Sequence, residues 1–194
     1  MTSRKNTTDL LKASYLPQKQ AADLMAKKGY TYDKNLSNME TKVFVDKNNK
    51  PVVTHRGSTR LSDWRDDLLL GVGLGKMTHR YKQAERMTKR VEEKYGKSDA
   101  VGHSLGGWLS ENTHHGGDTV TYNKAVGLGD IGKKKTHNQI DYKTSGDIVS
   151  VGSNLQKTNT VMIPNVNKSS NFFVNAYNAH DLNNIDEYFQ NANN

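Results

Sequence analysis

Two spacings of hydrophobic residues alternate along this chain, and together they predict an α/β fold. In residues 8–28 and 78–95, apolar side chains recur every three or four positions, which is typical of a helix with one buried face. Residues 41–45 and 51–55 are instead rich in Val and Thr. The polar stretch 46–50 between them has turn chemistry, so this region predicts a β-hairpin.

Shorter β-rich runs continue through the second half of the chain, at residues 98–101, 119–123, 140–143 and 161–163. Helical spacing returns after residue 182, near the end of the sequence. Strands that alternate with helices predict a sheet that is mostly parallel, with helices packed against it.

The length of 194 residues fits one domain, so we expect residues 1–194 to form a single unit. Within it we expect a helical N-terminal extension over 1–28 and a fraying tail over 187–194. No apolar run approaches 20 residues, and residues 1–12 lack the apolar core of a signal peptide. We therefore expect a soluble protein without a leader. The absence of cysteine excludes disulfides and thiolate metal sites.

The charge balance narrows the classes of partner. Lys and Arg number 28 against 20 Asp and Glu, for a net charge of +8, which favours an anionic surface such as a membrane. The tightest basic cluster is 133–135. No nucleic-acid motif with defined spacing is present, and the aromatics form no stacking pattern, so we expect no specific nucleic-acid binding.

The candidate chemistry begins with the sequence G-H-S-L-G at residues 102–106. A β-rich run precedes it and a helix-compatible stretch follows, which is the setting of a serine nucleophile on a sharp strand-to-helix turn. Gly102 and Gly106 supply the small neighbours that such a turn requires. Ser104 is then the nucleophile, and the backbone N–H of Leu105 is a donor for an oxyanion.

A serine nucleophile needs a base and an acid, which follow it along the chain in this architecture. His180 is the histidine late enough to follow a complete set of strands. Asp147 comes after a β-rich run and a glycine, which suits an acid at the carboxyl end of a strand. Asp141 remains an alternative acid. For the second oxyanion donor we expect Ser58, in the turn directly after the hairpin.

These motifs together resemble the class 3 lipase family of α/β-hydrolases. The resemblance is carried by R-G-S at 56–58, D-W at 63–64, G-H-S-L-G-G at 102–107 and D-I-V at 147–149, and it spans roughly Tyr30 to Ile185. The compact layout is also similar to the short lipase-like proteins of large DNA viruses and their relatives. This resemblance implies a cytoplasmic or virion-associated protein.

The resemblance implies a compact α/β-hydrolase-like fold and hydrolysis of carboxylic esters of lipids. It assigns Ser104, Asp147 and His180 as the triad, and the N–H groups of Ser58 and Leu105 as the oxyanion hole. No metal and no cofactor are expected. The sequence departs from the family pattern at His55, where an aromatic residue is usual, and at Trp108, where a small one is usual.

The segment that carries a helical lid in such enzymes is short here. We expect at most a small glycine-rich flap, formed by Leu70, Gly71, Val72, Gly73 and Leu74. A short flap favours small or singly acylated esters, or phospholipids, over bulky triacylglycerol. Two other interpretations stay open: a lipase-like fold retained as a structural or membrane-docking component of a virus particle, and a serine peptidase or thioesterase on the same fold.

Overall fold

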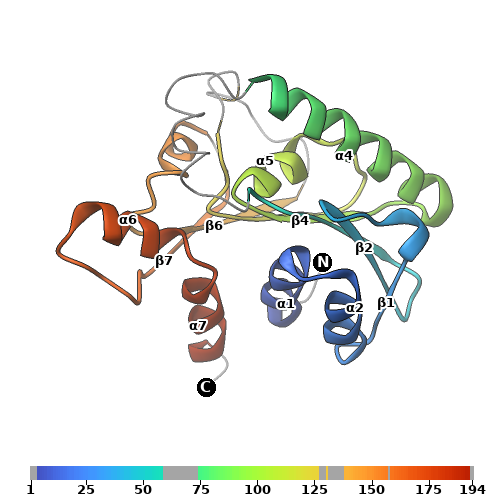
Figure 1. Ribbon diagram of the computed structural model, residues 1–194, viewed down its shortest axis with the longest axis horizontal. Coiled ribbons are helices and arrows are strands. Elements are labelled where there is room, and N and C mark those ends of the chain that lie inside the picture. The colour runs from blue at the N-terminus through green and yellow to red at the C-terminus, as the bar shows by residue number, and fades with distance from the viewer. Residues whose placement is uncertain (1–3, 59–73, 127–129, 131–137, 157, 193–194) are drawn as a thin grey trace.

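The computed structural model describes residues 4–58, 74–126, 130, 138–156 and 158–192 (Figure 1). The helices are α1 (Arg4–Tyr15), α2 (Gln18–Ala26), α4 (Leu74–Tyr95), α5 (Leu105–Asn112), α6 (Phe172–His180) and α7 (Asn183–Asn191). Two short 3-10 helices are η1 (Lys34–Leu36) and η3 (Val151–Leu155). The strands are β1 (Tyr30–Tyr32), β2 (Thr41–Asp46), β3 (Pro51–His55), β4 (Asp99–His103), β5 (Thr119–Tyr122), β6 (Gln139–Thr144) and β7 (Thr160–Ile163).

The strands form one seven-stranded sheet in the order β1-β2-β3-β4-β5-β6-β7. The first three strands pair antiparallel, and β3 to β7 pair parallel. The predicted α/β fold, with an N-terminal hairpin and a mostly parallel sheet, is therefore confirmed. β4 lies at the centre of the sheet, with three strands on each side of it.

Helices cover both faces of the sheet. Helices α4 and α5 lie on one face, whereas α1, α2 and α7 lie on the other, and α6 lies at the side of β6 and β7 (Figure 1). The main apolar core lies on the α1 face, where Val101, Val120 and Tyr122 from the central strands meet Leu10 and Leu11 of α1. Side chains alternate between the two faces of a strand, so His103 lies on the same face as Val101.

The α5 face of the sheet is polar around β5 and β6. Lys124 is 1% exposed at its side chain and forms ion pairs of 2.7 Å with Glu111 and 2.9 Å with Asp141. Next to them, Lys143 donates to the carbonyl of Ser150 at 2.9 Å. Hydrogen bonds and ion pairs thus fill space that apolar side chains occupy elsewhere, which accounts for the 34% hydrophobic content of the chain.

Besides the two 3-10 helices, one strand and one α-helix were not predicted from the sequence: the three-residue strand β1 and the helix α6, which ends at His180. Of the expected flap, residues 70–73 lie outside the described residues, and Leu74 begins α4. The final helix α7 extends to Asn191. Among the helices that the structure describes, none has the length and apolar character needed to cross a membrane.

Candidate active site

Ser104 lies at the junction between the central strand β4 and helix α5. Its backbone has φ 58° and ψ −126°, a left-handed conformation that costs a residue with a Cβ about 1–3 kcal/mol. Hydrogen bonds hold the backbone there, because the Ser104 N–H donates to the Tyr122 carbonyl and the Ser104 carbonyl accepts from the Ala125 N–H, each at 3.0 Å. The turn therefore presents the serine side chain at the carboxyl edge of the sheet.

The glycines of the motif allow this turn because backbone segments meet there. A Cβ at Gly102 would collide with the backbone of Gly106, and a Cβ at Gly106 would collide with the carbonyl group of His55. Helix α5 consequently starts directly against the ends of β3 and β4. Leu105 is its first residue, so the Leu105 N–H has no acceptor within the helix and points out of its positive end.

The loop that follows β3 runs against the nucleophile. A Cβ added to Gly57 would lie 3.1 Å from the Ser104 Cβ and 2.8 Å from the His103 carbonyl oxygen. Ser58, the expected oxyanion donor, is the next residue and is half-buried. Arg80 of α4 fixes this loop by donating to the Arg56 carbonyl at 2.7 Å.

The expected acid and base meet. The Nδ1 of His180 lies 2.9 Å from Oδ1 of Asp147, and both side chains are buried. A carboxylate only accepts, so the proton is on Nδ1, and Nε2 of the neutral ring carries the lone pair. Asp147 also accepts from the Val149 and Ser150 N–H groups, which fixes its carboxylate.

The end of α6 that carries His180 is held by side chains from the central strands. A helix leaves its last carbonyls without intrahelical partners. Here the Asn123 amide donates to the Ala179 carbonyl at 2.8 Å, the His103 Nε2–H donates to that of His180 at 3.0 Å, and the Tyr122 hydroxyl donates to that of Asp181 at 2.7 Å. The rings of His103 and His180 lie 4.5 Å apart, which places the base beside the chain that carries Ser104.

One chain of hydrogen bonds links the loop before Ser58 to the base. The Gly57 N–H donates to the Tyr15 hydroxyl at 3.2 Å, and that hydroxyl donates to His103 Nδ1 at 2.8 Å. His103 is neutral, because burial and the neighbouring His180 hold its pKa well below the usual range. Burial likewise raises the pKa of Tyr15, so its hydroxyl stays protonated. These groups share one buried network that reaches from α1 to α6.

The alternative acid, Asp141, is engaged elsewhere. Its carboxylate accepts from Lys124 Nζ at 2.9 Å and from the Thr121 hydroxyl at 2.7 Å, on the α5 face of the sheet. The His180 Nδ1 contact is made by Asp147. The geometry therefore favours Asp147 as the partner of the base.

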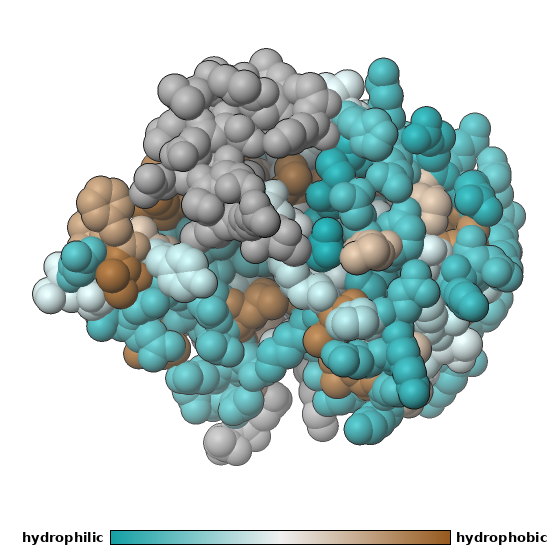
Figure 2. Space-filling view, viewed as in Figure 1, coloured by the Kyte–Doolittle hydropathy of each residue, from teal (hydrophilic) through white to brown (hydrophobic). Residues whose placement is uncertain are grey.

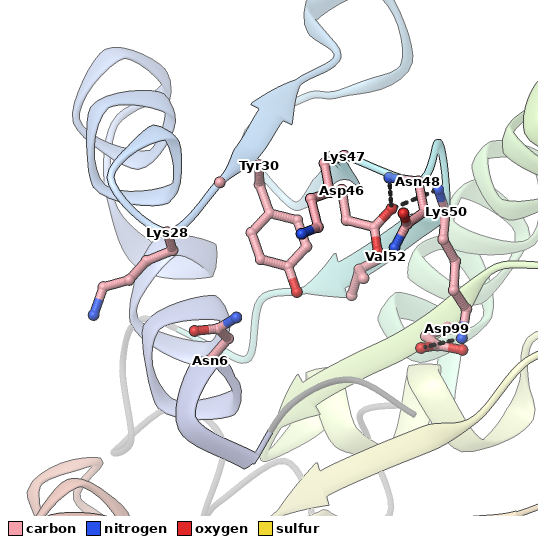
Figure 3. Close-up of a pocket in the computed structure, with 10 residues that line it drawn as sticks. Asn6, Lys28, Tyr30, Asp46, Lys47, Asn48, Lys50, Val52 and Asp99 are labelled. Atoms are coloured by element: carbon pink, nitrogen blue, oxygen red, sulfur yellow. Dashed lines mark hydrogen bonds and ion pairs between the residues drawn. The ribbon is translucent and has the colours of Figure 1, made fainter.

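A separate hollow of about 430 Å³ lies at the opposite end of β4, beneath the hairpin (Figure 3). It is lined by polar side chains, including Lys28, Asn48 and Asp99, and Lys50 forms a 2.9 Å ion pair with Asp99. Asp99 begins the strand that Ser104 follows, so five residues of extended chain, or roughly 16 Å, separate the hollow from the nucleophile. This hollow is not part of the serine site.

Comparison with known protein families decides the class of the chain. Residues 11–179 match the family described as the Tle-like phospholipase domain. The chain belongs to this family. The match includes Ser104 and Asp147 and covers most of the sequence. No curated protein is significantly similar to the chain.

Membership in this phospholipase-like family suggests that the chain hydrolyses lipids. Sequence reasoning missed several residues that position the candidate site, namely Tyr15, Arg80, His103, Tyr122 and Asn123. His103 was visible as the variable residue of G-x-S-x-G, and Asn123 directly follows a β-rich run. Tyr15 and Arg80 carry no local signal, because their partners lie 42 and 24 residues away.

Proposed function

We propose that this phospholipase-like domain is a serine carboxylic-ester hydrolase that acts on lipids, with Ser104 as nucleophile, His180 as base and Asp147 as acid. One observation carries the proposal. The residue at the strand-to-helix turn is a serine in a left-handed conformation, and a buried Asp–His pair lies at the same edge of the sheet. Membership in the phospholipase-like family supports a phospholipid as the substrate.

The reaction proceeds by acyl transfer in two steps. The Ser104 hydroxyl attacks the ester carbonyl while His180 Nε2 accepts its proton, and Asp147 stabilises the imidazolium that forms. The oxyanion accepts hydrogen bonds from the backbone N–H groups of Ser58 and Leu105. His180 then protonates the departing alcohol. In the second step it activates water, which releases the fatty acid and restores the serine.

The test is covalent labelling with a fluorophosphonate, followed by mapping of the modified peptide by mass spectrometry. We expect modification at Ser104 and its loss in Ser104→Ala. The wild-type protein should hydrolyse a short-chain p-nitrophenyl ester and a phospholipid, and Ser104→Ala should lose roughly 10⁶-fold in turnover, the loss known for a serine nucleophile in subtilisin. Ser110 is buried on the same helix, so Ser110→Ala is a matched control that should keep activity.

Two results would contradict the proposal. One is labelling at another serine with Ser104 unmodified. The other is equal inactivity of wild type and Ser104→Ala across esters, thioesters and peptides, which would favour a retained fold without catalysis. The finer resemblance to class 3 lipases and their viral relatives stays a prediction, and the substrate panel addresses it through the preference for triacylglycerol or phospholipid.

A further inference from the structure

Large apolar side chains are exposed beside the candidate site. On α6, Phe172 is 66% exposed, Phe173 65% and Tyr177 60%, and Val174 is exposed between them. In the turn after Asp147, Ile148 and Val151 are also exposed. We call this set the α6 apolar face: Phe172, Phe173, Val174, Tyr177, Ile148 and Val151. Figure 2 shows hydrophobic atoms gathered at the left edge of the molecule, where α6 lies.

The side of α6 opposite the α6 apolar face packs against the rest of the protein. The buried side of α6 consists of Ala176, Ala179 and His180. Asparagines fix the helix to the loop before it: Asn171 caps its N-terminus, and the Asn178 amide donates to the Asn167 carbonyl at 2.7 Å. Exposed apolar side chains of this size, gathered on one face, are typical of an interaction surface.

The turn that carries Asp147 and Ile148 packs on α6, the helix that carries His180. A Cβ added to Gly146 would lie 3.1 Å from the Asn175 amide and 3.9 Å from the Ala179 Cβ, so the turn that carries Asp147 and Ile148 packs on α6. Asp147 is itself bonded to His180, the last residue of that helix. Any surface that covers the α6 apolar face thus lies next to the candidate catalytic groups.

Charge decides between occupants of this face. A second copy of the chain would bring another +8 into contact, which opposes self-association. An anionic bilayer is attracted by the same charge, and α6 itself carries no carboxylate that would be repelled. A helix with Phe on its apolar side and Tyr beside it is typical of segments that lie in a membrane interface.

We infer that the α6 apolar face seats the protein on the surface of an anionic phospholipid bilayer. Phe172 and Phe173 enter the level of the acyl chains, and the Asp147–His180 pair comes to the plane of the ester groups. The inference rests on the proposed lipid-ester hydrolysis, since it names where that substrate is held.

The first experiment is co-sedimentation with vesicles of phosphatidylglycerol and phosphatidylcholine. The double variant Phe172→Ser/Phe173→Ser should bind these vesicles roughly 100-fold more weakly, because the apolar area of two aromatic side chains is no longer buried. Its kcat/KM on a water-soluble short-chain ester should stay within about twofold of wild type, whereas hydrolysis of vesicle phospholipid should fall with binding.

Met39→Ser is the matched control. Met39 is 70% exposed, but it lies two residues before β2, which is four strand spacings or roughly 19 Å across the sheet from β6. This variant should bind vesicles as wild type does. Equal loss of binding in Met39→Ser would overturn the assignment of the face.

A second measurement does not depend on how the double variant folds. The chain has no cysteine, so Phe173→Cys and Met39→Cys can each be labelled at one site with an environment-sensitive fluorophore. A blue shift on addition of vesicles is expected at position 173 and not at 39. No shift at 173, or a concentration-dependent dimer in its place, would overturn the inference.

The outcomes separate this inference from the proposed function. Ester hydrolysis without vesicle binding would contradict membrane docking through the α6 apolar face and support the proposed enzyme activity. Vesicle binding through position 173, with no fluorophosphonate labelling of Ser104, would contradict the proposed enzyme activity and support membrane docking through the α6 apolar face.

Discussion

Asp147 and Asp141 lie six residues apart, are equally buried at 2% exposure, and have different surroundings. Asp141 accepts from the ammonium group of Lys124, which also donates to Glu111. Asp147 accepts from the imidazole of His180 and from two backbone N–H groups. An ammonium group held between two carboxylates suits a structural tie, whereas an imidazole, which has one nitrogen to donate and one to accept a proton, suits proton transfer.

Replacing each aspartate by asparagine should give the largest difference between the two sites. Asp147→Asn should lower kcat by roughly 10⁴-fold, because the amide keeps the shape but no longer stabilises the imidazolium. Asp141→Asn should leave kcat per folded molecule within a few-fold and lower the thermal midpoint. The measurement is ester hydrolysis alongside thermal unfolding. The reverse pattern would make Asp141 the acid.

The structural tie itself is tested by Lys124→Met. This change leaves Glu111 and Asp141 as buried carboxylates without their shared cation, so the free energy of unfolding should fall by about 3–5 kcal/mol. Urea unfolding monitored by circular dichroism measures the loss. Lys94→Met, at an exposed lysine paired with Asp33, is the control and should change stability far less. Equal effects would place the Lys124 cluster outside the core.

The stability of the protein should fall in acid because of two buried neutral histidines. Burial lowers the pKa of His55 to about 3 and that of His103 well below its usual range, whereas both titrate near 6.5 in the unfolded chain. The unfolded state therefore binds more protons below pH 6.5, and each histidine makes stability fall by up to about 1.4 kcal/mol per pH unit on acidification.

His55→Phe should reduce the slope of the unfolding free energy against pH by the contribution of one histidine. The Nε2 of His55 has no hydrogen-bond partner among the described residues, and its Nδ1 lies 3.1 Å from the buried Thr41 hydroxyl. The phenyl ring removes that one hydrogen bond, which lowers stability by the same amount at each pH and leaves the comparison of slopes intact. Unfolding in urea at pH 7, 6 and 5 gives the slopes. Parallel curves for wild type and His55→Phe would show that His55 is protonated in the folded protein.

The smallest expected effect concerns the hydrogen-bond chain of the candidate site. Tyr15→Phe removes the hydroxyl between Gly57 and His103, so the loop before Ser58 loses its tie to the base. We expect kcat to fall about tenfold with KM nearly unchanged, because misplaced donors weaken binding of the transition state. Tyr30→Phe, at another buried tyrosine, should leave kcat unchanged. A rise in KM alone would show that Tyr15 shapes substrate binding.

The fold and the members of the candidate site were largely predictable, because their signals are local. The turn at Ser104 needs small residues at 102 and 106, and two β-rich runs joined by a turn sequence indicate the hairpin. Chain order then limited the base to His180. The relation between these groups was not predictable, since it depends on contacts such as that of Tyr15 with Gly57, which join α1 to the loop after β3, 42 residues away.

Helix α6 was missed for a physical reason. Periodicity finds a helix by its apolar stripe, on the assumption that the stripe is buried. In α6 the buried side consists of Ala176, Ala179 and His180, while the aromatic residues face outward. In α6 the small residues are buried and the large apolar residues are exposed, which is the reverse of the pattern that predicts a packed helix.

The position of β4 at the centre of the sheet has a consequence for motion. Its amides are bonded between β3 and β5, far from either edge, so they should exchange with deuterium only through unfolding of the whole domain. Helix α6 lies at the side of the sheet with one face exposed, so it should open locally more readily than β4. Protection from hydrogen exchange should therefore be high at Ser104 and lower at His180. A bilayer that binds α6 would slow the opening of this helix and bring the protection of His180 closer to that of Ser104.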